Sequence, residues 1–280
     1  MNQRSHPPHA AGAASKLPAV VASPGSDPLQ ATPAHVAPAL PDAGPRLQVS
    51  GLAKRFGDFP VLDSVTLTVD AGEIVAVLGP SGCGKTTFLD ILAGVTPADG
   101  GAIWWDGLPV TSLRGRVAYL QQRDLLLPWR SALANALLAA EIRGHKAAAR
   151  TRAGPLFQRL GLAGFERWRP GQLSGGMRQR VALARTLLGG GDLWLLDEPF
   201  AAVDALTRQE LHRLLKTVWE GQPAILVTHD VHEARRLAHR VVILSPRPAR
   251  VIATLPAREL SEERVVEMLR DGSDGFGHTR

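Results

Sequence analysis

The stretch GPSGCGKTT, residues 79–87, decides the fold of this chain. It meets the pattern G-x-x-x-x-G-K-[ST] through four residues, Gly79, Gly84, Lys85 and Thr86. The apolar, β-branched run at 74–78 predicts a buried strand before the glycines, and the spacing at 88–93 predicts a helix after them. A glycine loop between a strand and a helix is the context that predicts phosphate binding.

Each residue type in this loop has a physical reason to be there. Gly79, Gly82 and Gly84 can take positive φ values, which lets backbone N–H groups face an anion. The helix that begins near Lys85 adds the positive end of its dipole. Lys85 can reach the β- and γ-phosphates of a nucleotide, and the Thr86 hydroxyl can coordinate Mg²⁺. The sequence therefore predicts a nucleotide site.

Composition excludes several classes of protein. The 280 residues are 45% hydrophobic, which is ample for the core of one or two domains. No apolar run approaches the ~18 residues of a membrane span, and residues 1–45 hold no secretory signal. We therefore expect a cytoplasmic protein that does not cross the bilayer itself. The single cysteine excludes an internal disulfide, and the scattered His residues form no zinc pattern.

The net charge of +6 fits a nucleic acid, an acidic membrane surface or nucleotide phosphates as partner. The sequence shows no recognition-helix pattern and no stripe of interleaved basic and aromatic residues. We expect no nucleic-acid partner, and a solvated surface with excess arginine explains the charge.

Two segments differ from the rest of the chain. Residues 1–45 are dominated by Pro and Ala, and we expect a disordered tail because such a segment buries too little apolar surface to offset its ordering entropy. Residues 46–280 are the expected folded domain. Within it, the Ala/Leu-rich stretch from 131 to 164, interrupted at Gly144 and at Gly154-Pro155, predicts a helical insertion. We place the helical subdomain at about 123–175.

Carboxylates and a histidine follow two predicted strands. The run DLWLLD at 192–197 ends in Asp197-Glu198, and the apolar run at 224–227 is followed by Thr228 and His229. Open α/β sheets place their chemistry at the carboxyl ends of strands. Beside a phosphate loop, this acidic pair predicts a catalytic edge.

A second anion site is predicted where a helix begins near residue 175. Ser174 is a natural N-cap, and Gly175 and Gly176 expose backbone N–H groups at the helix N-terminus.

Together these motifs resemble the ATP-binding subunits of ABC transporters over about residues 46–255. The matching motifs are the phosphate loop at 79–87, the glutamine loop at Gln122, the signature at 173–179, the acidic pair Asp197-Glu198, the loop at 201–204 and the switch histidine His229. The resemblance implies an α/β fold, that of a P-loop NTPase with an ABC-type nucleotide-binding domain, an antiparallel β subdomain and a helical insertion.

The resemblance implies that the chain binds ATP and Mg²⁺. The nucleotide would contact Phe56 as the base-stacking residue and the phosphate-loop residues Gly79, Pro80, Ser81, Gly82, Cys83, Gly84, Lys85, Thr86 and Thr87. Thr86 and Gln122 would coordinate Mg²⁺, with Asp197 in its outer shell. Gln121 is adjacent, and counting back from residues 126–129 places the family's glutamine on Gln122.

The resemblance also assigns catalysis. Glu198 would act as general base on the attacking water, or orient it, and His229 would contact the γ-phosphate and this water. Two copies would pair head to tail, so that one copy's signature residues Ser174, Gly175, Gly176 and Met177 face the γ-phosphate held by Lys85 of the other. Asp204 would lie at that dimer interface.

The stretch LLPWR at 126–130 resembles the importers of nitrate, taurine, aliphatic sulfonates and the pyrimidine precursor of thiamine. Residues 122–129 and the short link at 220–223 look most like the thiamine-precursor type. The implied partners are a second copy of the chain, integral membrane permease subunits and, indirectly, a solute-binding protein. The permease would dock beside the glutamine loop, with Trp129 as a contact. The chain would be peripheral, at the cytoplasmic face of the inner membrane.

Two alternatives share the nucleotide motifs. The basic charge suits a soluble ABC ATPase of translation or DNA repair, but such proteins carry two nucleotide domains or a long coiled coil, and the gap from 87 to 173 is too short for one. An exporter motor would use the same catalytic residues, and only the neighbourhood of Pro128 and Trp129 argues against it.

Cys83 lies next to a helix N-terminus, which tends to lower the pKa of a thiol. We therefore expect a reactive thiol that maleimide modifies and that MgATP protects.

Overall fold

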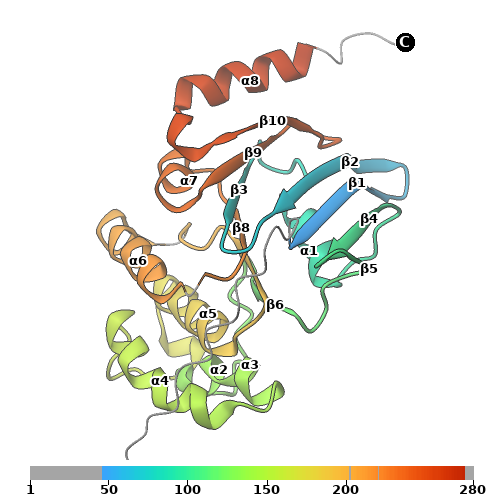
Figure 1. Ribbon diagram of the computed structural model, residues 1–280. Helices are drawn as coiled ribbons and strands as arrows, with labels where there is room; N and C mark the ends of the chain where they lie inside the picture. Colours follow the sequence, from blue (N-terminus) through green and yellow to red (C-terminus); the bar gives the residue numbers. More distant parts are fainter. Residues whose placement is uncertain (1–45, 202, 220, 275–280) are drawn as a thin grey trace, which may run out of the picture. The chain divides into compact units, whose positions relative to one another are not determined.

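The computed structural model describes residues 46–274 except 202 and 220 (Figure 1). The expected tail at 1–45 and the last residues, 275–280, lie outside the described residues. The described chain forms two sheets with helices, and this confirms the expected α/β fold with an antiparallel β subdomain.

The larger sheet has six strands in the order β10-β9-β3-β8-β7-β6. Their bounds are β3 Ile74–Leu78, β6 Val117–Leu120, β7 Leu193–Asp197, β8 Ala224–Val227, β9 Arg240–Leu244 and β10 Val251–Pro256. All neighbouring pairs are parallel except β9 with β10. Every residue of β3, β7 and β8 is buried, which explains why these strands read as unbroken apolar runs.

The smaller sheet is antiparallel, in the order β2-β1-β4-β5. Its strands are β1 Leu47–Phe56, β2 Phe59–Val69, β4 Gly100–Trp105 and β5 Leu108–Val110. Val65, Leu67 and Val69 of β2 are buried, in one hydrophobic cluster with residues of β3 and of the helix that follows it.

Eight helices and two 3₁₀ turns lie within the described residues. The helices are α1 Lys85–Ala93, α2 Ala132–Ala136, α3 Leu138–Ile142, α4 Lys146–Arg159, α5 Gly175–Gly189, α6 Ala205–Val218, α7 Val231–Leu237 and α8 Glu262–Asp274; the turns are η1 Pro170–Gln172 and η2 Ala257–Glu259. Helices α2, α3 and α4 lie between β6 and α5 in the chain and gather beside α5 (Figure 1). They occupy the stretch where the helical insertion was expected.

One predicted interruption of this region is present and the other is wrong. Gly144, with a φ of 81°, separates α3 from α4 as expected. Helix α4, however, runs through Pro155. A proline inside a helix costs about 3 kcal/mol, whereas burying each large apolar side chain gains about 1.5–3 kcal/mol. Leu156 and Phe157 are both buried in the core, so packing holds the helix together across the proline.

Candidate active site

The carboxyl ends of three neighbouring parallel strands meet at one edge of the larger sheet. β3 leads into the phosphate loop, β7 ends at Asp197 beside Glu198, and β8 leads through Thr228 to His229. The topology therefore brings together the motifs that the sequence placed at separate strand ends, because parallel strands share an edge.

An open cavity of about 220 Å³ lies at this edge. It is lined by Ser81, Gly82, Gly84, Lys85, Thr86, Thr87, Gln122, Asp197, Glu198 and Arg247. Of the two adjacent glutamines, Gln122 lines this cavity. Arg247 was missed by the sequence analysis. Its Nε donates to the Gly82 carbonyl at 3.1 Å, and no motif signals a contact between residues so far apart in the chain.

The phosphate loop takes the shape that its glycines permit. Gly82 and Gly84 have φ values of 74° and 125°. A Cβ on Gly84 would also lie 2.9 Å from the Leu62 side chain. The expectation of positive φ is wrong for Gly79, which needs glycine for another reason: a Cβ there would lie 3.0 Å from the Leu244 carbonyl oxygen.

Lys85 is buried, with 7% of its surface exposed. Its Nζ donates to the carbonyl oxygens of Gly79 at 2.7 Å and Pro80 at 2.9 Å. An ammonium group has three protons to donate, so these two bonds do not exhaust it. The lysine thus places a positive charge at the base of the phosphate loop.

Thr86 and Asp197 are joined across the cavity floor. The Thr86 hydroxyl donates to Asp197 Oδ2 at 2.7 Å. Burial raises the pKa of Asp197 to about 6, although the hydrogen bond from Thr86 acts to lower it. Mg²⁺ binds oxygen ligands and usually takes only one or two carboxylates from the protein. The hydroxyl, the carboxylate and the Gln122 amide that line this cavity fit that donor set.

Glu198 has a strained backbone, with a φ of 47°. Its N–H donates to the Val227 carbonyl at 2.9 Å, which fixes it against β8. Its Oε1 lies 3.4 Å from His229 Nδ1. Non-glycine residues in this conformation persist only where their surroundings hold them, and they cluster at active sites.

A family model described as ABC transporter matches residues 62–201. The chain belongs to the ABC transporter family. The taurine import ATP-binding protein TauB of Yersinia pestis bv. Antiqua (strain Antiqua) is 43% identical over 212 residues, which are 75% of this chain and 83% of that protein. TauB of Escherichia coli O157:H7 is 41% identical over 213 residues, or 75% of this chain and 84% of that protein.

Solved structures of ABC proteins share the fold. The dimeric ATP-binding cassette MJ0796 bound to ADP and Pi has a TM-score of 0.67 and 26% identity, covering 76% of this chain and 100% of that chain. An ATP-binding subunit of an ABC transporter has a TM-score of 0.70 and 28% identity, covering 79% and 98%. Together with the TauB relatives, these findings confirm an importer-group ABC subunit whose ATP hydrolysis is coupled to transport.

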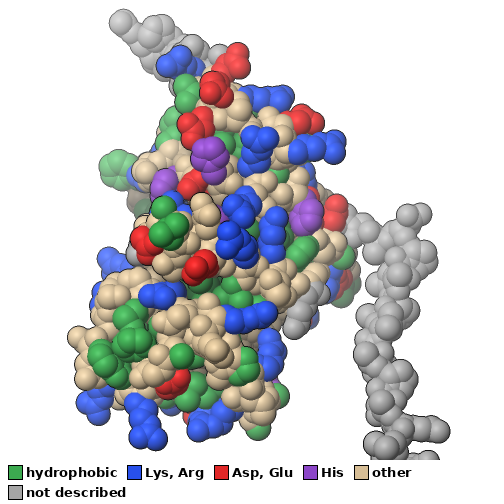
Figure 2. Space-filling model, turned by 90° about the vertical axis from the view of Figure 1, so that its left-hand side faces the viewer, with side chains coloured by type: hydrophobic (Ala, Val, Ile, Leu, Met, Phe, Trp, Pro, Cys, Tyr) green, Lys and Arg blue, Asp and Glu red, His purple; other side chains and the backbone are tan. Residues whose placement is uncertain are grey.

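Lys and Arg side chains are spread over the face seen in Figure 2, with Asp and Glu among them. Within residues 46–274, apart from 202 and 220, no helix is long and apolar enough to cross a membrane.

Besides His229, which lines the neighbouring 30 Å³ cavity, three expected ABC motifs lie outside the 220 Å³ cavity's lining. Ser174 caps α5, its Oγ accepting from the Met177 N–H at 3.2 Å. Asp204 caps α6 in the same way, and hydrogen bonds from Thr207 hold the pKa of its carboxyl below the usual value. Phe56 is 51% exposed, with Lys54 Nζ 5.4 Å from its ring centroid. The structure gathers the phosphate loop, Gln122 and the acidic pair around one cavity, and these three motifs lie outside its lining.

The expected reactivity of Cys83 is wrong. Its side chain is 2% exposed and packs in the hydrophobic cluster beneath the loop. Burial raises the pKa of this thiol despite the nearby charge of Lys85. Helix N-termini lower thiol pKa values where the sulfur stays solvated, and here it does not.

Proposed function

We propose that Glu198 activates or orients the attacking water in ATP hydrolysis and that His229 works beside it. The observation that carries this proposal is the Glu198–His229 pair, with Oε1 and Nδ1 3.4 Å apart at the strand ends where the cavity opens. A carboxylate can take the water's proton, and the imidazole can reach toward the γ-phosphate.

The nucleotide would bind in the cavity at the same edge of the larger sheet. Lys85 and the loop amides bind the β- and γ-phosphates, and Phe56 is the proposed base-stacking residue. Thr86, Gln122 and Asp197 would hold Mg²⁺, with Asp197 in its outer shell. When bound, the ion neutralises charge that develops on the phosphate oxygens.

Two copies of the chain complete each other's sites in this proposal. Residues 174–177 of one copy face the γ-phosphate held by Lys85 of the other, and Asp204 lies at the interface. Ser174 and Gly175 are exposed at the N-terminus of α5, outside the lining of their own cavity. The dimeric MJ0796 cassette with ADP and Pi supports this arrangement.

The transported solute that we propose is taurine or another small sulfonate, because the relatives described above carry that name. The sequence motifs favoured the pyrimidine precursor of thiamine, but the relatives described above are named for taurine import. The partners are permease subunits and a solute-binding protein, and the chain sits peripherally at the cytoplasmic membrane face. Leu125 and Trp129, 52% and 68% exposed, offer the permease an apolar contact beside Gln122.

Growth of the native host tests the substrate. Deleting the gene should abolish growth on taurine as sole sulfur source while growth on sulfate continues, because the solute cannot enter without its motor. The wild-type gene should restore growth, and the Glu198→Gln gene should not. Undiminished growth on taurine would contradict the assignment. If the deletion instead stops the thiamine pyrimidine precursor from supporting growth of a strain that cannot make this precursor, the assignment moves to that solute.

A further inference from the structure

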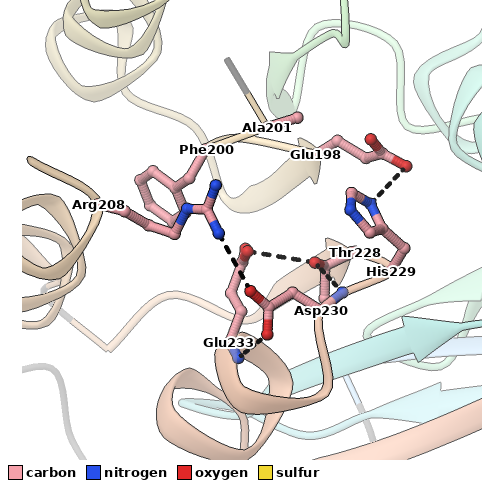
Figure 3. Close-up of a pocket in the computed structure, with 8 residues that line it drawn as sticks. All are labelled: Glu198, Phe200, Ala201, Arg208, Thr228, His229, Asp230 and Glu233. Carbon is pink, nitrogen blue, oxygen red and sulfur yellow. Dashed lines mark hydrogen bonds and ion pairs between the residues drawn. The ribbon is translucent and has the colours of Figure 1, made fainter. Parts of the chain in front are cut away.

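A second, smaller cavity of about 30 Å³ lies beside the Glu198–His229 pair (Figure 3). A water molecule needs about 10–15 Å³ of such space and two to four polar partners. The cavity is therefore large enough for one water. Its polar lining comes from α6, α7, the segment after β8 and Glu198, which follows β7.

Two buried groups of this cavity lack a protein partner. Glu233 of α7 is 4% exposed; its Oε2 accepts from the Thr228 hydroxyl at 3.2 Å, and its Oε1 has no partner among the described residues. Arg208 of α6 bonds through its terminal nitrogens to Asp230 and Val203, but its buried Nε has no partner in the same part of the chain. Leaving such a group unsatisfied costs about 1–3 kcal/mol. Both residues line this cavity, which is large enough for one water.

This network holds both neighbours of His229. The Thr228 hydroxyl accepts from the Asp230 N–H at 3.0 Å while donating to Glu233. Asp230 Oδ1 accepts from the Glu233 N–H at 3.0 Å, and its Oδ2 lies 3.3 Å from Arg208 Nη1. Figure 3 shows these contacts on one side of the segment that carries His229 and the Glu198 contact on the other.

We propose that Glu233 and Arg208, bridged by a water in this cavity, are positioning residues that hold His229 against Glu198. The proposal rests on the catalytic roles given above to Glu198 and His229. Neither Glu233 nor Arg208 lines the cavity of the phosphate loop, so both act through the 228–230 segment.

The charges around Glu233 fit a neutral carboxyl. Burial raises the pKa of Glu233 to about 8, the Thr228 hydrogen bond acts against this, and the Asp230 charge adds to it. The Arg208 charge lowers the pKa, and the more distant Glu198 charge raises it. At neutral pH Glu233 then carries no charge, and the Arg208 guanidinium faces a single carboxylate, that of Asp230. Ionising Glu233 adds a second carboxylate, which repels Asp230 and disturbs the segment that carries His229.

Rate measurements on two variants test the positioning role. Glu233→Ala should lower kcat about 10- to 100-fold and leave KM for ATP within about twofold, because a small misplacement of a reacting group costs rate rather than binding. Glu233→Gln keeps the shape of the neutral acid and should retain most of kcat. The matched control is Glu210→Gln, an exposed acid on α6, which should match wild type.

The pH profile separates positioning from a merely structural role. Wild-type kcat should fall as pH rises through about 8, the pKa of Glu233, and Glu233→Gln should lack this fall. Because the folded state holds the proton above the usual pKa of 4.5, wild type should also lose unfolding free energy relative to Glu233→Gln as pH rises toward 8. Identical pH profiles of kcat would overturn the proposal, even if Glu233→Ala fails to fold.

A double-variant cycle with His229→Ala identifies the residue through which Glu233 acts. If Glu233 works through His229, the double alanine variant should be no slower than His229→Ala. Multiplied losses would overturn the proposal while leaving His229 catalytic. Wild-type hydrolysis by His229→Ala alone would instead remove the role that we propose for His229.

Discussion

Replacing Glu198 with Gln should lower the ATP hydrolysis rate by about 10²- to 10⁴-fold, the usual contribution of a general base. The amide has nearly the same shape but cannot take a proton from water. Glu198 is fixed by the Val227 bond and held 3.4 Å from His229 Nδ1, so the substitution changes chemistry without moving the backbone.

ATP affinity should stay within about twofold, because in our proposal Lys85 and the loop amides, not Glu198, bind the phosphates. Phosphate release measures hydrolysis, and fluorescent nucleotide titration measures binding. Glu210→Gln supplies the matched acid-to-amide control on an exposed helix surface. Unchanged hydrolysis by Glu198→Gln would remove the proposed role of this residue.

Replacing Asn135 with Ala should lower the free energy of unfolding by about 3 kcal/mol, because the substitution leaves several buried backbone groups unsatisfied. Asn135 is fully buried. Its Oδ1 accepts from the Leu127 N–H at 2.7 Å. Its Nδ2 lies within hydrogen-bond distance of three carbonyl oxygens, those of Leu127, Arg130 and Ser131. Urea unfolding measures the change.

The control for this prediction is Gln158→Ala on the exposed face of α4, where we expect a change within about 0.5 kcal/mol. An equally small change at Asn135 would contradict the reading of these bonds.

Asn135 holds the loop that carries Trp129 through its bonds to Leu127 and Arg130. The same loop is tied to α5, since Arg185 donates to the Asp124 and Leu125 carbonyls at 2.7 and 2.9 Å. Arg178 also pairs with Asp124, 2.9 Å apart. Because α5 begins at the proposed signature, we propose that these contacts link a permease bound at this loop to the nucleotide interface.

The geometry of the phosphate loop was predictable because it depends on neighbouring residues. Residues 79–87 lie between one strand and one helix, and the run into Asp197-Glu198 marks a strand end without any knowledge of the sheet. Parallel pairing of β3, β8 and β7 brings these strand ends together. The order of the motifs along the chain already indicated that they would meet.

What the sequence could not reveal depends on distant contacts. Arg247 reaches Gly82 from 165 positions away, and its own neighbourhood shows no phosphate-site motif. In the sequence Glu233 looks like an ordinary acid in the first turn of a helix. Its burial beside Arg208 of α6 depends on a contact between two helices, which the sequence pattern does not show. The thiol of Cys83 and the helix through Pro155 were misjudged for the same reason: burial outweighed the local preference.

If residues 174–177 of a second copy complete each ATP site, the chain should dimerise when it binds ATP. In the Glu198→Gln background, sedimentation should show a dimer with ATP and a monomer without it. Adding Ser174→Arg should leave ATP binding intact and keep the chain monomeric, because the new side chain fills the space of the partner's γ-phosphate. A Ser174→Arg chain that still dimerises fully with ATP would contradict the shared site.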